Sequence, residues 1–138
     1  MARISRSSPQ GALRHGKYRW DFVQIQLNYV DWRHAYETNK RNQDAIYLYG
    51  ECEKRGIPVV VMEPLLGGRL ARFNYTLAEK LIPLDPEATL AKWAFRFAGH
   101  HPKVMTVLSG MTYREHLEER RPFRAGRTLS PRCPRSGA

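Results

Sequence analysis

Residues 56–70 read Gly-Ile-Pro-Val-Val-Val-Met-Glu-Pro-Leu-Leu-Gly-Gly-Arg-Leu, and this stretch decides how the chain folds. Gly56 is a helix stop, and the apolar run behind it lacks polar alternation, which is typical of a strand buried on both faces. The run ends in a glycine turn, Gly67-Gly68, with the basic residue Arg69 behind it. Because α/β proteins bind ligands where parallel strands end, the stretch predicts a buried parallel strand followed by a ligand loop.

The same pattern occurs twice more along the chain. Residues 22–27 precede a loop at 28–32, and residues 104–108 precede a turn at 109–112. Strands that alternate with helices predict an α/β fold with a parallel sheet and right-handed crossovers. The helices are indicated by apolar residues at amphipathic spacing, namely Ala45, Leu48, Tyr49 and Cys52, and then Leu90, Trp93, Ala94, Phe97 and Ala98.

Local signals predict where further helices begin and how the cysteines behave. Asp85 followed by Pro86 predicts the start of the second long helix. A short extra helix is expected around Thr76–Leu81, and residues 112–115 read as the capping box of a last helix. Cys52 lies on an apolar stripe and is expected to be a small buried hydrophobe, so no disulfide or metal site is indicated.

The excess positive charge lies at the two ends of the chain. The net charge is +10 over 138 residues, yet residues 1–20 hold five Lys/Arg and residues 120–138 hold six Arg, with no acidic residue in either segment. We therefore expect a basic irregular head over 1–17, a folded segment over 18–119, and a basic disordered tail over 120–138.

The composition also argues against several function classes. Basic ends attract polyanions without specificity, and no zinc-finger or RNP-type pattern accompanies them, so no specific nucleic-acid partner is predicted. The sequence has neither an apolar run of about eighteen residues nor the pattern of a secretory leader. No membrane partner is expected, and the predicted localisation is cytoplasmic.

Two turns carry the features of a phosphate site. Gly67 and Gly68 permit close approach of the backbone to a ligand, with Arg69 beside them. Residues 109–112 lead into a helix whose first amides would be unpaired, and Arg114 lies in its first turn. The alternative is that these glycines only serve tight turns.

A polar face on the first strand offers a second candidate feature. Gln24, Gln26 and Asn28 share one face at the period of a strand, and buried carboxamides need hydrogen-bond partners. They could form an internal polar layer or bind a ligand amide. Tyr29 and Trp32 could stack on a ring or pack. His100 and His101 end a helix, where a cation complements the dipole.

Taken together, these segments resemble the aldo/keto reductase family, and within it the bacterial predicted-oxidoreductase subgroup. Residues 20–32 resemble the sixth strand of its barrel and residues 54–71 the seventh strand. Residues 93–98 resemble the following helix, and residues 104–111 the eighth strand. The resemblance covers residues 18–119 and implies the last three βα units of a (β/α)8 TIM barrel.

The resemblance implies an NADP(H) cofactor bound at the carboxyl ends of these strands. Gln24 matches the residue that binds the nicotinamide carboxamide, and Met62 stands where many members stack an aromatic ring. The remaining matches divide between the pyrophosphate loop and the loop that holds the adenosine 2′-phosphate. The implied cofactor-binding set is Gln24, Met62, Glu63, Pro64, Leu65, Gly67, Gly68, Arg69, Ser109, Gly110, Met111, Thr112 and Arg114.

The same resemblance implies that no catalytic residue lies in this chain. The family's catalytic Asp, Tyr, Lys and His belong to the first half of the barrel, and no residue here matches them. The chain would then supply cofactor-binding loops for carbonyl reduction and be inactive alone. Two alternatives are a non-enzymatic module that pairs with the missing barrel half or with itself, and a small flavodoxin-like domain that binds a phosphorylated ligand.

Overall fold

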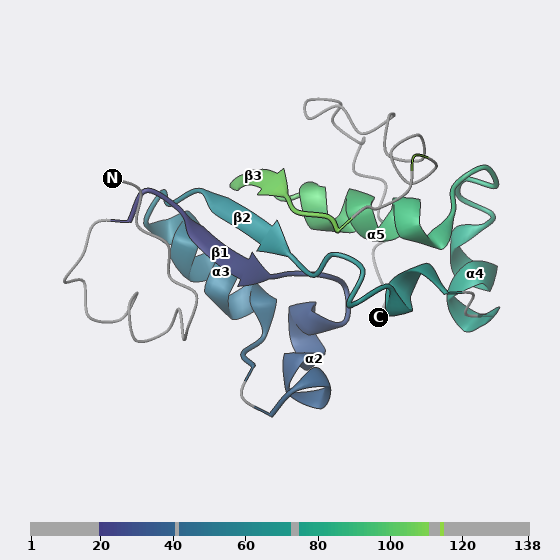
Figure 1. Ribbon diagram of the computed structural model, residues 1–138, viewed down its shortest axis with the longest axis horizontal. Helices are drawn as coiled ribbons and strands as arrows, with labels where there is room; N and C mark the ends of the chain where they lie inside the picture. Colours follow the sequence, from purple (N-terminus) through teal and green to yellow (C-terminus); the bar gives the residue numbers. More distant parts are fainter. Residues whose placement is uncertain (1–19, 41, 73–74, 111–113, 115–138) are drawn as a thin grey trace, which may run out of the picture.

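Three parallel strands form the centre of the molecule. The computed structural model describes residues 20–40, 42–72, 75–110 and 114. β1 (Val23–Gln26), β2 (Val59–Met62) and β3 (Val104–Val107) pair in the order β1-β2-β3 (Figure 1). This confirms the predicted strands. The order follows the chain, as in consecutive βα units of a barrel, and shows none of the reversal that marks a flavodoxin-like switch point.

The two strand pairings differ in regularity. β1 and β2 pair in even register, from Val23 opposite Val59 to Gln26 opposite Met62. Between β2 and β3 the register slips after Val59, so that Val104 and Thr106 face successive residues of β2. Met105 is left out of the pairing and is exposed.

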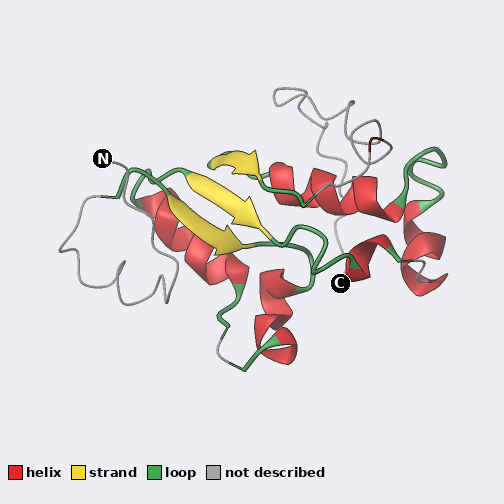
Figure 2. Cartoon of the chain, viewed as in Figure 1, coloured by secondary structure: helices red, strands yellow, loops and turns green. Residues whose placement is uncertain are grey.

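The helices occupy the crossovers between strands (Figure 2). α3 (Ala45–Lys54) was predicted, and the short helix α4 (Tyr75–Leu81) was expected at nearly its observed position. None of the helices in the described residues is long and apolar enough to cross a bilayer. The helical segments are α2 (Asp31–Thr38), α3 (Ala45–Lys54), the 3-10 turn η1 (Arg69–Ala71), α4 (Tyr75–Leu81) and α5 (Leu90–Gly99).

Two predictions about helix boundaries were wrong. Residues 28–32 do not form only a loop, because α2 begins at Asp31. Asp85 does not open α5, which begins at Leu90 after Thr89. Instead, the Asp85 carboxylate accepts a hydrogen bond from Arg96 at 2.7 Å, which fastens the preceding turn to the side of the helix. The predicted last helix lies outside the described residues except for Arg114, which is helical.

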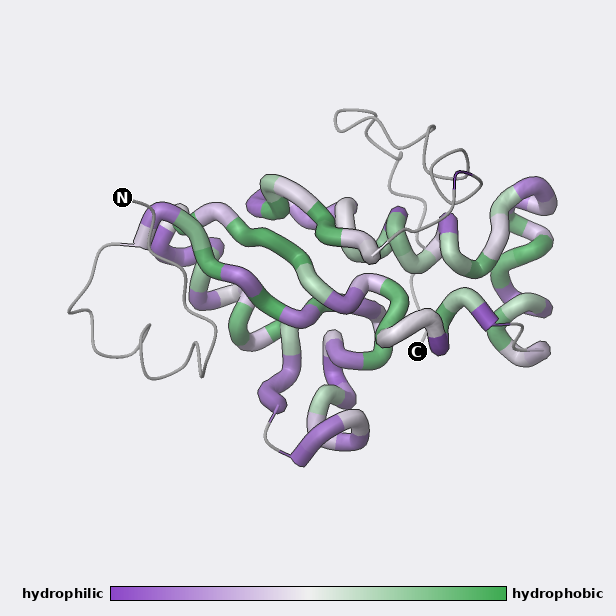
Figure 3. Tube along the Cα trace, in the orientation of Figure 1, coloured by the Kyte–Doolittle hydropathy of each residue, from purple (hydrophilic) through white to green (hydrophobic). Residues whose placement is uncertain are grey.

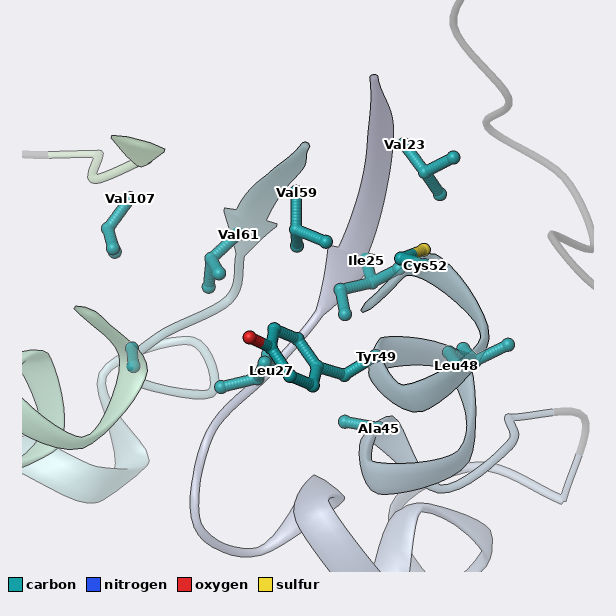
Figure 4. Close-up of a cluster of buried hydrophobic side chains, with 11 residues drawn as sticks. Val23, Ile25, Leu27, Ala45, Leu48, Tyr49, Cys52, Val59, Val61 and Val107 are labelled. Carbon is teal, nitrogen blue, oxygen red and sulfur yellow. The ribbon is translucent and has the colours of Figure 1, made fainter. Parts of the chain in front are cut away.

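The hydrophobic core lies between the sheet and α3 (Figure 4). Along β1, buried residues alternate with half-buried glutamines, whereas the first three residues of β2 are all buried. Figure 3 shows the same contrast, with a hydrophobic β2 beside an alternating β1. Cys52 is fully buried in this core, and burial raises its pKa to about 11, as expected of a structural cysteine. The other core members include Val23, Ile25, Leu27, Leu48, Tyr49, Val59 and Val61.

An aromatic cluster joins α2, α3 and α5 beside this core. Trp32 stacks on His101 with ring centroids 4.5 Å apart, and Tyr49 and Phe97 lie against the same pair. Tyr29 contacts Phe97 edge-on at 6.1 Å. Tyr29 and Trp32 therefore pack within the protein, which answers the alternative that the sequence left open.

His101 does not act as a cation at the end of α5, contrary to the expectation. Desolvation by burial, together with the nearby His100, lowers its pKa to about 4. Within the described part of the chain its Nε2 atom is buried and has no hydrogen-bond partner. The imidazole is therefore neutral near pH 7 and works as a flat packing surface for Trp32.

Acidification is expected to destabilise the fold through His101. The unfolded chain binds a proton on this residue near pH 6.5, whereas the folded chain resists protonation until about pH 4. Its contribution is therefore complete above the unfolded pKa and is lost as pH falls toward the folded one, by about 2–3 kcal/mol. Urea unfolding at pH 7 and pH 4 should show a smaller loss in His101→Phe than in wild type. The exposed His34→Phe serves as control, and an equal loss in all three proteins would contradict the assignment.

Candidate functional site

The loop between β2 and η1 folds back tightly on itself. Gly67 and Gly68 have φ values of 61° and 83°, which lie in the left-handed region that glycine adopts freely. Glu63 and Leu66 also have positive φ, at 53° and 49°, which is unusual for residues with a side chain. Inside the loop the Leu66 N–H donates to the Glu63 carbonyl at 3.1 Å. The two glycines therefore form a tight turn, and this turn follows the carboxyl end of β2.

The Glu63 carboxylate closes this loop. Its Oε2 atom accepts a hydrogen bond from the Gly67 N–H at 2.7 Å. Its backbone carbonyl accepts a second bond from the Nδ2 atom of Asn28, at 3.0 Å. Asn28 lies beyond the carboxyl end of β1 and is fully buried, so the loop after β2 is anchored to the neighbouring strand.

The end of β3 lies next to this loop. The Leu108 N–H donates to the carbonyl of Val61 at 2.8 Å, which holds the two strand ends side by side. Ser109 and Gly110 follow at once. A Cβ atom built on Gly110 would meet nothing within 4 Å, so this glycine borders open space.

The amino end of α5 forms the third wall. Thr89 caps the helix, with its side-chain oxygen accepting from the Lys92 N–H at 3.1 Å. Free amides and the helix dipole make such an end electropositive. Lys92 lies in this first turn and is half-buried, so its ammonium group adds a positive charge to the same wall.

These three elements border an open cavity of about 980 Å³ at the carboxyl edge of the sheet. Ligand cavities commonly hold about 300–1,000 Å³, so the space suits a large organic ligand. Eight residues from the sequence-derived set line it, drawn from both turns: Met62, Glu63, Pro64, Leu65, Gly67, Gly68, Ser109 and Gly110.

The other residues of that set lie elsewhere. Gln24 is half-buried and is not part of the lining, but its Nε2 atom donates to the sulfur of the lining residue Met62 at 3.2 Å. Arg69 and Arg114 are exposed and are not part of the lining. Met111 and Thr112 lie outside the described residues. The positive charge in the cavity wall therefore comes from Lys92 and not from the two arginines named from the sequence.

Sequence reasoning missed the α5 part of the lining. It placed the helix start at Asp85, which left the true first turn in the helix interior. The usable signal was Thr89, an N-cap residue type directly before the first apolar residue of the periodic stripe, Leu90. The lining residues missed in this way, or through their place in η1 and β3, are Ala71, Thr89, Ala91, Lys92, Phe95 and Leu108.

The polar face of β1 forms an internal network beside the cavity. The Asp31 carboxylate accepts from Gln26 at 2.7 Å and from Asn28 at 2.5 Å. The Asn28 oxygen in turn accepts from the Val30 and Asp31 N–H groups. Gln26 and Asn28 are thus satisfied within the protein, as one of the two alternatives held. Within the described residues, no three His, Cys, Asp or Glu side chains gather as a metal site.

Comparison with known families agrees with this arrangement. A family model described as Aldo/keto reductase family matches residues 3–121 of the 138 residues. A search of curated proteins returned no match. The matched range holds all three parallel strands and both turns at the cavity, and it spans well over half of the sequence. The chain belongs to the aldo/keto reductase family.

Proposed function

We propose that this chain binds NADP(H) in the cavity at the carboxyl edge of the sheet and supplies the cofactor-binding loops of an aldo/keto reductase. The observation that carries the proposal is the convergence of two turns and a helix start on one space of about 980 Å³. Eight of the residues that the family resemblance assigns to the cofactor border that space. A nicotinamide cofactor would supply the hydride for carbonyl reduction.

The chemistry of the lining fits a phosphate-bearing ligand. The amino end of α5 and the half-buried Lys92 provide positive charge, and Thr89 and Ser109 provide hydroxyl groups. Gly110 leaves space beside the backbone. In this proposal Lys92 and the helix amides hold phosphate, while Gln24, Met62 and the turn at Gly67-Gly68 take the roles given by the family resemblance.

We further propose that the chain does not reduce carbonyls by itself. The family reaction uses a tyrosine acid next to a lysine, and among the described residues the cavity lining holds Lys92 but no tyrosine. Burial raises the pKa of both Tyr29 and Tyr49, which makes them weaker proton donors. General acid catalysis contributes about 10²–10⁴-fold, so NADPH oxidation with aldehydes should remain at background.

The Gly110→Val variant tests the proposed site. The new side chain would project into open space and should leave the fold intact, while it fills the place where the ligand would approach the backbone. We expect calorimetric titration with NADP⁺ to show at least about tenfold weaker binding, equivalent to about 1.4 kcal/mol.

Gly50→Ala is the matched control, because Gly50 also has open space at its Cβ position but lies on α3, outside the cavity lining. It should bind NADP⁺ like wild type. Equal affinity in Gly110→Val and wild type would contradict the proposed site, and turnover by the chain that is lost in Tyr29→Phe would contradict the proposed inactivity.

A further inference from the structure

The exposed carboxylate of Glu63 borders the cavity, at the place where, under the proposed function, a phosphate would meet the loop. The Glu63 Oε2 atom accepts from the Gly67 N–H at 2.7 Å, which is the length of a charge-assisted hydrogen bond. Both residues line the cavity. A backbone N–H gives one strong hydrogen bond, so the Gly67 amide cannot at the same time bind a ligand phosphate at full strength.

The position of this carboxylate is set by the fold. Glu63 has a φ of 53°, a left-handed conformation that residues with side chains adopt uncommonly. Its carbonyl accepts hydrogen bonds from the Leu66 N–H at 3.1 Å and from the buried Asn28 amide at 3.0 Å. The buried Asn28 side chain holds the backbone at Glu63 in place. The Cα atom of Glu63 therefore has a fixed position, from which the side chain reaches Gly67.

The cavity is bordered by both positive and negative charge, and the two have opposite effects on the binding of an anion. Lys92 and the amino end of α5 favour an anion, whereas Glu63 carries negative charge on the facing loop. A phosphate that reached the Gly67 amide would have to displace the carboxylate and then remain near it. Like charges at such a separation repel even at a solvated surface, although solvent reduces the effect.

We propose that Glu63 competes with the phosphate of the ligand for the Gly67 N–H and thereby limits the affinity of the cavity for NADP(H). The inference rests on the proposed function. In the free protein the carboxylate keeps the loop closed. When the ligand leaves, the carboxylate returns to the amide, so that dissociation is faster than from a loop with an unpaired donor.

Binding of NADP⁺ to Glu63→Gln tests this competition. Glutamine keeps the shape of the side chain but removes its charge, so we expect affinity to rise about three- to tenfold and dissociation to slow by a similar factor. Adenosine 2′,5′-bisphosphate, which lacks the nicotinamide half, shows whether the gain comes from phosphate contacts. Glu79→Gln is the matched control, because Glu79 is an exposed residue of α4 outside the cavity lining.

Amide hydrogen exchange gives a second readout that needs no ligand. Glu63→Ala should speed exchange at the Gly67 N–H about tenfold, since the carboxylate no longer protects it, and Glu79→Gln should not. Unchanged exchange would overturn the inference whatever the binding data show.

The outcomes separate the two proposals. If wild type binds NADP⁺ and Glu63→Gln binds it equally or more weakly, the competition is refuted and the proposed function stands. Binding that is detectable only in Glu63→Gln would support the competition. No binding by wild type or either variant would overturn the proposed function and this inference together.

Discussion

The Asn28→Ala variant is expected to lose about 3–5 kcal/mol of unfolding free energy. The Asn28 side chain is fully buried and makes hydrogen bonds to two backbone amides, to the Asp31 carboxylate and to the Glu63 carbonyl. Its removal would leave Gln26 as the one remaining side-chain donor, among the described residues, to the Asp31 carboxylate, and Asp31 is only 1% exposed. Chemical denaturation monitored by circular dichroism measures the loss.

A double-variant cycle separates this network from simple loss of packing. Asn28→Ala combined with Asp31→Ala should cost less than the two single changes added together, because the second change removes the charge that the first leaves short of a donor. Glu79→Ala, at an exposed position of α4, should change stability by less than about 0.5 kcal/mol. Strict additivity of the two changes would contradict the proposed coupling.

The Leu27→Ala variant is expected to cost about 3–5 kcal/mol. Leu27 is fully buried and belongs to the core cluster between the sheet and α3, so truncation removes buried apolar area and leaves a cavity. Leu84→Ala makes the same chemical change at a residue that is 65% exposed and should cost less than about 0.5 kcal/mol. Urea unfolding compares the two variants. Similar losses would show that Leu27 does not belong to the core of the folded protein.

The parts of the fold that could be predicted from the sequence depend on local pattern. β2 was predictable because three consecutive valines between a helix stop and a glycine turn admit few other structures. α3 was predictable because Ala45, Leu48, Tyr49 and Cys52 share one face, and all four are buried. In both cases the side chains that decide the structure are neighbours in sequence.

The parts that were missed depend on contacts between distant residues. Asp85 has the residue type of a helix cap, but its carboxylate accepts a hydrogen bond from Arg96, eleven residues further along the chain in α5. The true cap is therefore Thr89. His101 has the residue type of a helix-end cation, but Trp32, far away in sequence, covers one face of the ring. The sequence pattern alone does not show whether a side chain will cap the nearest helix or contact a residue further away in the sequence.

The residues of the candidate site also fall into a group that local sequence predicts and a group that depends on contacts between distant residues. The turns at Gly67-Gly68 and Ser109-Gly110 could be predicted, because a tight turn at a strand end favours glycine and small polar residues, which are visible in the sequence. Lys92 was missed because its importance comes from where α5 starts relative to the turns. The contact of Glu63 with Gly67 was missed because it requires a left-handed backbone at a glutamate, which sequence pattern does not favour.

A chemical-shift titration with adenosine 2′,5′-bisphosphate tests most directly whether the cavity is a cofactor site. We expect saturable chemical-shift changes at residues 67–70, 91–92 and 108–110, which become smaller but persist as the salt concentration rises. Partial persistence is expected because Lys92 is half-buried, and buried charges are screened less than exposed ones. Shifts that are confined to the arginines of residues 120–138 and vanish with modest salt would show non-specific attraction to a basic segment and would contradict the account.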